Sequence, residues 1–258
     1  MTMNYMKQIR DYVPVCKQER MDKETILHFI KDHNHNVLLR DNTIAHLTAS
    51  GFIVDPTFTK VLFIYHKVYQ SWGWTGGHMD GDPDLLTVAL KEASEETGLK
   101  NLRPLSKNLM SLDILPVWGH MKKKAYISAH LHLNGTFILI GDPDEPLVMN
   151  EEETEGVQWI DVDVMERYSN EPYMVTVYKK LIKAAKAYKP EPDAKEPLET
   201  MAKTDKGFLN KVTEAAVPIA ILEAKSAYYK LKLVKEVGEG LLTESQKLLK
   251  KRHKKKKE

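Results

Sequence analysis

Apolar and polar residues alternate in some stretches of the chain and recur at helical spacing in others. Runs rich in β-branched and aromatic residues predict strands over residues 47–54, 60–68, 108–117, 124–133, 136–140 and 157–160. Helical spacing predicts helices over residues 23–39, 83–97 and 172–188. The order of these segments indicates an α+β fold, with a mixed sheet and helices on both of its sides.

Three glutamates share one face of the predicted helix over residues 83–97. Glu92, Glu95 and Glu96 are spaced i, i+3 and i+4, so an α-helix presents their carboxylates together. Carboxylates crowded this closely repel one another unless a cation offsets their charge. Oxygen ligands favour hard cations such as Mg²⁺ or Mn²⁺, which also bind phosphate oxygens. The alternative interpretation is an exposed acidic helix face with i, i+4 salt bridges.

Glycines and a proline mark the two ends of this helix. Residues 76–78, Gly-Gly-His, follow an apolar run and predict a loop between a strand and the helix. Asp82 has the character of an N-cap, with Pro83 at the first helical position. Gly98 is expected to end the helix, because glycine readily adopts the left-handed conformation of a C-terminal cap.

The same segment resembles the signature of the Nudix hydrolases: Gly, five residues, Glu, seven residues, then Arg-Glu-apolar-x-Glu-Glu-x-Gly-apolar. Counted from Gly77, residues 91–99 read Lys-Glu-Ala-Ser-Glu-Glu-Thr-Gly-Leu, so the glycine, the late glutamates and the final Gly-Leu match. Lys91 replaces the arginine, which keeps the charge but loses the bidentate fork. Pro83 replaces the first glutamate, and three nearby aspartates are candidates for the missing carboxylate: Asp80, Asp82 and Asp84.

The resemblance implies a Nudix-type α/β/α sandwich and hydrolysis of a diphosphate bond with Mg²⁺ or Mn²⁺ as cofactor. It implies four metal ligands: Gly77 through its backbone carbonyl, Glu92, Glu95 and Glu96. Glu92 would be a ligand or the general base, and Lys91 would hold a glutamate in place. Family members often draw a further catalytic glutamate from the loop before a late strand, and the corresponding residue here is Glu153.

Several histidines lie near the predicted active face. His130 and His132 are two apart in a predicted strand, so both side chains emerge on one face of the sheet. His78 lies beside the box glycines, and His46 and His120 flank other predicted strands. His78, His130 and His132 could contact an anionic substrate or hold a second metal such as Zn²⁺ or Mn²⁺. The alternative is that they are hydrogen-bonded residues of a half-buried sheet.

Trp74 is a further candidate substrate-binding residue, because a base or aryl group could stack on its ring. The alternative is that this ring fills the core beside the box segment. Histidine-rich metal sites also occur in isopentenyl-diphosphate isomerases, which share the Nudix fold. An isomerase-like activity is therefore a minor alternative.

Composition narrows the range of partners. The 38 basic and 36 acidic residues nearly balance, so net charge by itself names no partner. The single cysteine, Cys16, excludes an internal disulfide and fits a reducing cytoplasm. No apolar run reaches the ~18 residues of a membrane span, and residues 1–20 lack the apolar stretch of a secretory signal. We therefore expect a cytoplasmic protein with no membrane partner. The substrate that the family resemblance implies is a small-molecule diphosphate.

Changes in composition divide the chain into four segments. These are a helical N-terminal segment (1–45), a Nudix hydrolase domain (46–188), a charged, proline-rich linker (189–206) and a helical extension with a basic tail (207–258). No aromatic residues interleave with the lysines of the tail, which disfavours a nucleic-acid partner. The apolar spacing over residues 208–237 could pack across a homodimer.

We therefore predict a Nudix hydrolase, a pyrophosphohydrolase that acts on a nucleoside diphosphate derivative or a similar small molecule. One alternative is a catalytically weak Nudix-like ligand sensor or regulator, which Pro83, Lys91 and the basic extension would fit. Another is an interaction protein that keeps the fold as a scaffold. Substrate turnover distinguishes the hydrolase from the ligand sensor. Stabilisation by metal distinguishes the hydrolase from the scaffold.

Overall fold

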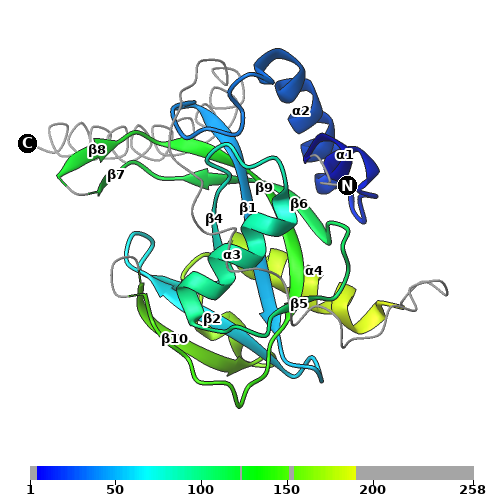
Figure 1. Ribbon diagram of the computed structural model, residues 1–258, viewed down its shortest axis with the longest axis vertical. Coiled ribbons are helices and arrows are strands. Elements are labelled where there is room, and N and C mark those ends of the chain that lie inside the picture. The colour runs from blue at the N-terminus through cyan, green and yellow to red at the C-terminus, as the bar shows by residue number, and fades with distance from the viewer. Residues whose placement is uncertain (1–4, 123, 151–153, 190–258) are drawn as a thin grey trace, which may run out of the picture. The chain divides into compact units, whose positions relative to one another are not determined.

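The fold is that of a computed structural model, which describes residues 5–122, 124–150 and 154–189 (Figure 1). Its helices are α1 (Tyr5–Asp11), α2 (Lys17–His33), α3 (Leu85–Thr97), the 3₁₀ helix η1 (Met165–Arg167) and α4 (Pro172–Ala187). Its strands are β1 (Ala45–Val54), β2 (Lys60–His66), β3 (Ser71–Gly73), β4 (Thr75–His78), β5 (Arg103–Pro104), β6 (Ser111–Val117), β7 (His120–Lys122), β8 (Ala125–Ile127), β9 (His130–Ile140) and β10 (Thr154–Asp161). Among the helices described, none combines the length and apolar character of a membrane span. The predicted linker and extension lie, from residue 190 onward, outside the described residues.

Strands β1 and β9 form the centre of a mixed sheet and run parallel along the full length of β1. On its other edge β1 takes two antiparallel partners, β4 alongside residues 48–51 and β2 alongside Ile53 and Val54. β10 and β3 pair with β2, and β6 and β5 pair with successive parts of β9. The neighbour of β1 on this edge therefore changes from β4 to β2 at Phe52.

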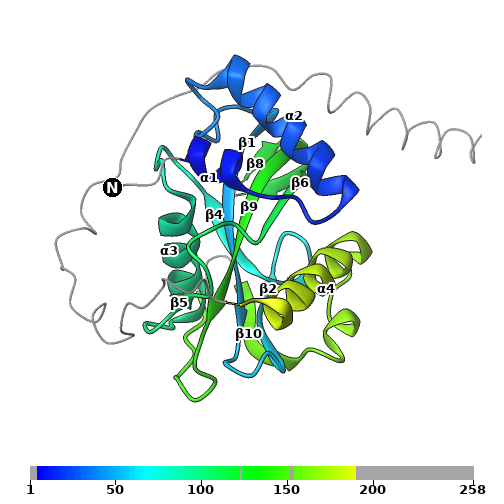
Figure 2. The same cartoon turned by 90° about the vertical axis from the view of Figure 1, so that its right-hand side faces the viewer.

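Helices cover both sides of this sheet. Figure 2 shows α3 on one side of β1 and β9 and α4 on the other. On the α3 side the backbones approach closely, since a Cβ added at Gly51 would lie 3.3 Å from the Cβ of Ala93. On the α4 side Tyr178 stacks on Phe52, with ring centroids 5.7 Å apart. The predicted α/β/α sandwich with a mixed sheet is confirmed.

One face of the central strands changes from polar to apolar along their length. On β1 the alternate residues of this face are His46, Thr48, Ser50, Phe52 and Val54. On β9 they are His130, His132, Asn134, Thr136, Ile138 and Ile140. The two strands are parallel and in register, with His46 opposite His132, so the polar halves lie side by side. The apolar halves form the core with α4.

Two predictions about the central strands were wrong. Residues 76–78, predicted as a loop, form the end of β4, because the edge of β1 pairs with them and places Gly77 opposite Ala49. The predicted break between the strands over 124–133 and 136–140 does not exist, and β9 runs through Gly135. A Cβ there would lie 2.9 Å from Leu109, so this glycine allows close packing and does not end the strand.

The helix predicted over residues 23–39 was also placed too far along the chain, since α2 ends at His33. After it the chain folds into tight turns, in which Asn36 donates its backbone N–H to His33 and Leu39 to Asn36, both at 3.0 Å. The side chain of Asn36 also receives a hydrogen bond from Asn42. Asparagine favours such local hydrogen bonds over a helix interior, which explains the early end.

A buried ion cluster joins α4 to β6 and α2. The Nζ of Lys180 lies 2.6 Å from Glu19 Oε1 and 2.7 Å from Asp113 Oδ1. Both carboxylate side chains are fully buried, and the hydroxyl oxygen of Ser111 lies within hydrogen-bond distance of each of them. Although burial opposes the charge of Lys180, the neighbouring Asp113 and Glu19 keep the pKa of its ammonium above the usual value. The cluster therefore depends on one cation that neutralises two anions.

We expect Lys180→Met to lower the free energy of unfolding by about 3–5 kcal/mol, because it leaves two buried carboxylates without a counter-ion. Denaturant titration measures this value. The matched control is Lys179→Met, which removes an exposed pairing with Glu166 and should cost less than about 1 kcal/mol. Equal effects of the two substitutions would contradict the role given to the buried cluster.

Candidate active site

A cavity of about 740 Å³ opens over the polar half of the central strands. Its lining includes box residues on β4 and α3: Gly76, Gly77, Glu92 and Glu96. It also includes the histidines of the central strands and of β4: His46, His78, His130 and His132. Aromatic side chains close another part of it: Tyr69, Trp74, Tyr173 and Tyr178. The fold therefore brings carboxylates, imidazoles and aromatic rings to one cavity.

Glu92 lies directly against the backbone of Gly77. A Cβ added at Gly77 would overlap the carboxyl group of Glu92, so only glycine leaves room for this carboxylate. One turn further along α3, Glu96 is 4% exposed, and its Oε2 accepts the backbone N–H of Gly76 at 3.0 Å. The helix thus presents two of its three box carboxylates to the edge of β4 and to the cavity.

Lys91 lies beside the carboxylates of Glu92 and Glu95. Its Nζ is 2.9 Å from Glu92 Oε1 and 3.3 Å from Glu95 Oε2. Partial burial opposes its charge, but the hydrogen bond and charge of Glu92, together with Glu95, raise the pKa of Lys91 above the usual value. Glu95 is half exposed and is not part of the cavity lining. Lys91 therefore holds Glu92 from the solvent side while Gly77 bounds it on the other.

Two capping interactions fix helix α3 in this position. The side chain of Asp84 accepts the backbone N–H of Thr87 at 2.9 Å, and the helix begins at Leu85. The predicted N-cap at Asp82 and first turn at Pro83 were therefore wrong by two residues, because Asp84 is the side chain that reaches the free N–H. At the other end Gly98 has φ of 78° and donates to Ser94, which confirms the predicted helix end.

None of the three aspartates near Pro83 lines the cavity. Asp80 pairs with the guanidinium of Arg40, which keeps the pKa of this carboxyl low although burial opposes that shift. Asp82 accepts the backbone N–H of Asp84, and Asp84 caps α3. All three carboxylates have structural partners, so the position of the first box glutamate has no substitute among them.

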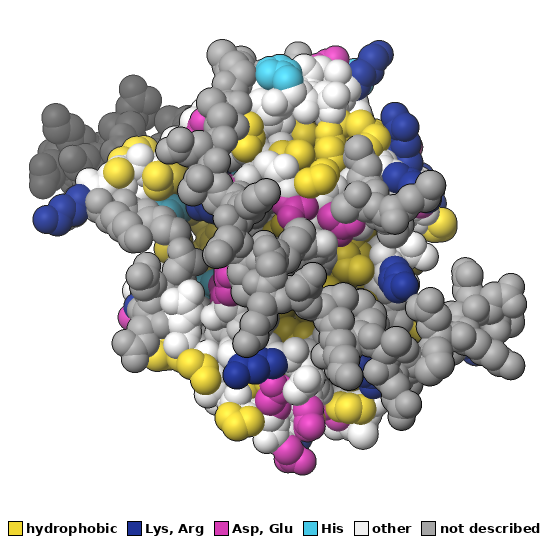
Figure 3. Space-filling model, viewed as in Figure 1, with side chains coloured by type: hydrophobic (Ala, Val, Ile, Leu, Met, Phe, Trp, Pro, Cys, Tyr) yellow, Lys and Arg dark blue, Asp and Glu magenta, His cyan; other side chains and the backbone are white. Residues whose placement is uncertain are grey.

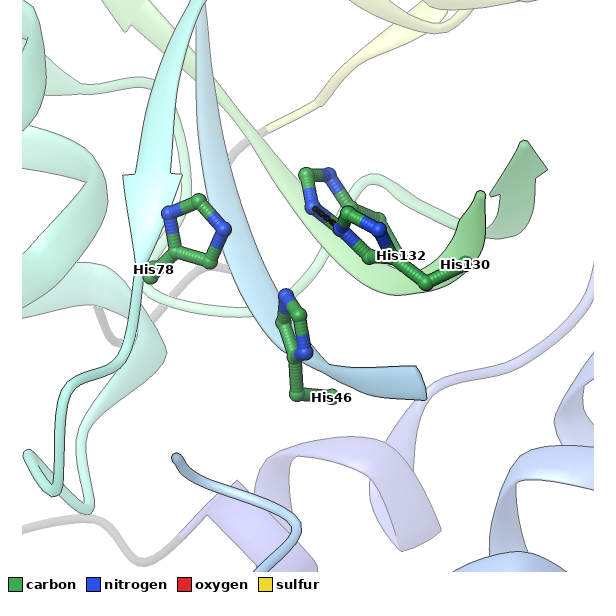
Figure 4. A group of neighbouring side chains, drawn as sticks. All are labelled: His46, His78, His130 and His132. Atoms are coloured by element: carbon green, nitrogen blue, oxygen red, sulfur yellow. Dashed lines mark hydrogen bonds between the residues drawn. The ribbon is translucent and has the colours of Figure 1, made fainter. Parts of the chain in front are cut away.

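The histidines come together from separate parts of the chain. His46, His78, His130 and His132 each offer a ring nitrogen within 4.8 Å of the others, and Figure 4 shows the rings turned toward one another. The expectation that His130 and His132 emerge on one sheet face is thus met. His120, by contrast, lies on β7 outside this group, and its Nδ1 donates to the backbone carbonyl of Trp118. The prediction gave His46 no site role, although it belongs to the cluster.

Beneath the cluster, Asn134 organises the polar residues of the central strands. Its Oδ1 accepts the hydroxyls of Thr48 at 2.8 Å and Ser50 at 2.9 Å, and its Nδ2 donates to Thr136 at 2.9 Å. All four side chains are buried. Sequence reasoning passed over Asn134 and His46, but both lie on polar positions that alternate along β1 and β9. That pattern was the available signal.

Trp74 has a place both in the core and at the cavity. It is 7% exposed and meets Tyr178 edge-on, with ring centroids 5.5 Å apart.

Burial raises the pKa of Tyr69 to about 12, so its hydroxyl stays protonated beside the cavity at neutral pH. Glu153, the further catalytic candidate, lies outside the described residues.

Comparison with known proteins identifies the family. A model of the NUDIX domain matches residues 45–184, which is more than half of the chain. The chain belongs to the Nudix family. It is therefore a Nudix hydrolase, and its diphosphate-cleaving chemistry follows from that membership. No sequence among curated proteins matches it.

Several solved structures are similar to this Nudix hydrolase. An Ap4A hydrolase from C. elegans is 13% identical with a TM-score of 0.43, and the match covers 55% of this chain and 98% of that one. A NUDIX-family hydrolase from Clostridium perfringens is 19% identical with a TM-score of 0.38, over 54% and 96% of the two chains. The E. coli dihydroneopterin triphosphate pyrophosphohydrolase is 12% identical with a TM-score of 0.40, over 53% and 94%.

Nudix hydrolases generally use divalent metals, and the donors of this site suit a hard cation. The carboxylates of Glu92 and Glu96 line one wall of the cavity, and Glu92 fills the space that a side chain at Gly77 would need. Oxygen donors of this kind select Mg²⁺ or Mn²⁺. On the face in Figure 3 acidic and basic side chains both appear, scattered among hydrophobic ones.

We expect Asn134→Ala to lower the free energy of unfolding by about 1–3 kcal/mol, because it leaves the buried hydroxyls of Thr48 and Ser50 without their acceptor. Chemical denaturation measures the change. Asn101→Ala is the control, since Asn101 is exposed and donates only to Glu145, and it should have almost no effect. A stability unchanged by Asn134→Ala would show that these hydroxyls do not depend on the amide.

Proposed function

We propose that this Nudix hydrolase cleaves the diphosphate bond of a nucleoside diphosphate derivative or a similar small molecule, with Mg²⁺ or Mn²⁺ as cofactor. The single observation that carries the proposal is the position of Glu92, whose carboxylate rests on Gly77 at the cavity wall. A carboxylate at this place can act on a substrate in the cavity, whereas one on an exposed helix face could not.

On the family resemblance the metal ligands would be Glu96 and the carbonyl of Gly77 at the cavity wall, with Glu92 as a further ligand or as the general base. Glu95, the remaining ligand that the resemblance implies, is half exposed and lies outside the cavity lining. A bound divalent cation supplies neutralisation of the diphosphate charge and activation of water. Glu92 would accept the proton of the attacking water as the general base, which adds about 10²–10⁴-fold to the rate. The backbone N–H of Gly76 fixes Glu96, and Lys91 fixes the outer oxygen of Glu92.

Other lining residues are suited to hold the substrate. Arg40 and Lys67 border the cavity and bring positive charge near the phosphates. Trp74 offers a ring edge for a base or aryl group, and His78 and His132 offer ring nitrogens to anionic oxygens. Glu153 remains a candidate for additional acid–base work on the sequence resemblance alone.

A ligand sensor is the second candidate, and one observation favours it. Pro83 takes the place of the first box glutamate, and each neighbouring aspartate is committed to Arg40, to a backbone N–H or to the helix cap. A site with one carboxylate fewer would bind a diphosphate and turn it over slowly. A scaffold without ligand is disfavoured, because Glu96 is buried at the cavity wall close to the partly buried Glu92, and two neighbouring carboxylates are costly without a cation.

A panel of nucleoside diphosphate derivatives, incubated with Mg²⁺ or Mn²⁺, separates these functions. Release of two phosphorylated halves that depends on the metal supports the hydrolase. Tight binding of panel members without turnover supports the sensor. Thermal melts that Mn²⁺ leaves unchanged, with neither binding nor turnover, support the scaffold.

We expect Glu92→Gln to lower kcat by about 10²–10⁴-fold, because the amide keeps the shape but cannot accept a proton. Steady-state kinetics on the best panel substrate measure the loss. Glu24→Gln, at an exposed position of α2, is the control and should leave kcat unchanged. Full activity of the Glu92 variant would remove this residue from the mechanism.

We expect Gly77→Ala to lower kcat by at least about 10²-fold, because the new methyl group displaces the carboxylate of Glu92. The double variant Gly77→Ala/Glu92→Gln tests the cause. If the methyl group acts through Glu92, the double variant loses no more activity than Glu92→Gln alone. Multiplied losses in a protein that still folds by circular dichroism would contradict this explanation.

A further inference from the structure

The four-histidine cluster has the arrangement of a metal site that is chemically different from the glutamate site. The rings come from three strands, His46 from β1, His78 from β4, and His130 and His132 from β9. Most pairs of ring centroids lie 4.9–5.1 Å apart. Each residue offers one nitrogen to a volume in which the four ligand atoms lie within 4.8 Å of one another.

His46 shows which of its nitrogens is available. Its Nδ1 lies 3.0 Å from the backbone carbonyl of Asn42, and a carbonyl only accepts, so Nδ1 carries the proton. In the neutral ring Nε2 then has an exposed lone pair. This Nε2 is buried and has no hydrogen-bond partner among the residues that the structure describes. A buried polar atom without a partner is costly, and a metal ion would satisfy it.

His130 is arranged in the same way. Its Nδ1 lies 2.9 Å from the carbonyl of Ser128, which leaves Nε2 as the electron-pair donor of the neutral ring. A backbone carbonyl on the far nitrogen is the usual arrangement for histidines that bind metals, because it fixes the tautomer and the ring orientation. Two of the four rings therefore already have the outer hydrogen bond that metal ligands require.

The spacing of the donors also fits a small tetrahedral ion. With Zn–N bonds of about 2.0–2.1 Å, two ligands of a tetrahedron lie ~3.4 Å apart. The Nε2 atoms of His130 and His132 are 3.3 Å apart. The remaining donors lie within 4.8 Å, so closure around an ion needs only small ring rotations. The strand register holds the backbones in place for this, since His46 is opposite His132 and His78 is opposite Thr48.

The protonation state of the cluster agrees with this geometry. Burial, with the neighbouring histidines adding to it, lowers the pKa of His46 to about 4 and that of His78 and His132 well below the usual value. Burial thus favours the neutral ring, and neutral imidazole is the form that binds metals.

We propose that His46, His78, His130 and His132 form a second cation site, which takes a transition metal of the Zn²⁺ class. Imidazole nitrogen favours Zn²⁺ and its neighbours in the transition series, whereas the carboxylates of Glu92 and Glu96 favour Mg²⁺ or Mn²⁺. Four neutral ligands leave the ion with its full charge. The filled site is thus a compact positive centre in the cavity that also contains the glutamates, and it attracts anionic substrate oxygens.

The test is the metal content of the full, tag-free chain after chelator treatment and dialysis against Zn²⁺ or Co²⁺. We expect one equivalent of Zn²⁺ per chain that survives desalting, and with Co²⁺ the intense visible absorption of a tetrahedral nitrogen site. His46→Asn and, separately, His132→Asn should weaken binding by more than the ~10–100-fold that loss of an outer hydrogen-bond partner costs. His28→Asn is the control, since this side chain is exposed on α2, and it should keep the full stoichiometry.

Glu92→Gln separates this site from the hydrolase site. It should keep the Zn²⁺ stoichiometry while turnover is lost, so each site can fail by itself. Circular dichroism establishes that the histidine variants are folded, and His78→Asn at the end of β4 replaces any variant that is not. Zn²⁺ that does not survive desalting, a six-coordinate Co²⁺ spectrum, or stoichiometric Zn²⁺ binding that persists in the folded histidine variants would overturn the proposal.

Discussion

The parallel, in-register pairing of β1 with β9 is the constraint on which the rest of this Nudix hydrolase depends. Because His46 is opposite His132, residues of equal parity on the two strands share a face. That face begins with histidines and hydroxyls and ends with Phe52, Val54 and two isoleucines. One pairing therefore creates both a polar floor for the cavity and an apolar surface for α4. A slip of one residue would exchange the two faces and remove both.

Helix α3 depends on a second constraint, the absence of side chains at Gly76 and Gly77 of β4. Asp84 and Gly98 set the length of α3, so its glutamates have fixed positions along the axis. Gly77 then leaves the space that the carboxylate of Glu92 occupies at the cavity wall. Glycine weakens a strand interior, but here the ladder with β1 compensates for that cost. Gly77 thus leaves room for the carboxylate of Glu92 and does not form a turn.

Two kinds of donor meet in one cavity, and they make opposite electrostatic demands. Glu96 is a buried carboxylate and Glu92 a partly buried one, and Lys91 supplies positive charge to Glu92. Burial disfavours the protonation of His46, His78 and His132, and a neutral ring adds a lone pair without adding charge. Because carboxylate oxygens lie in one part of the cavity and imidazole nitrogens in another, ligand chemistry alone can discriminate between hard and borderline cations.

The sequence by itself determined the local features of this protein. Helical periodicity put Glu92, Glu95 and Glu96 on one face, Gly98 ended the helix, and the alternation of His130 and His132 put both on one side of a strand. Tertiary structure decided the rest: that residues 76–78 are a strand, that Asp84 is the cap, and that His46 meets His130, 84 positions further along the chain. The reason is physical, because residue spacing fixes geometry only within one helix or strand. Which strands become neighbours, and in which register, depends on how all of them bury their apolar faces together.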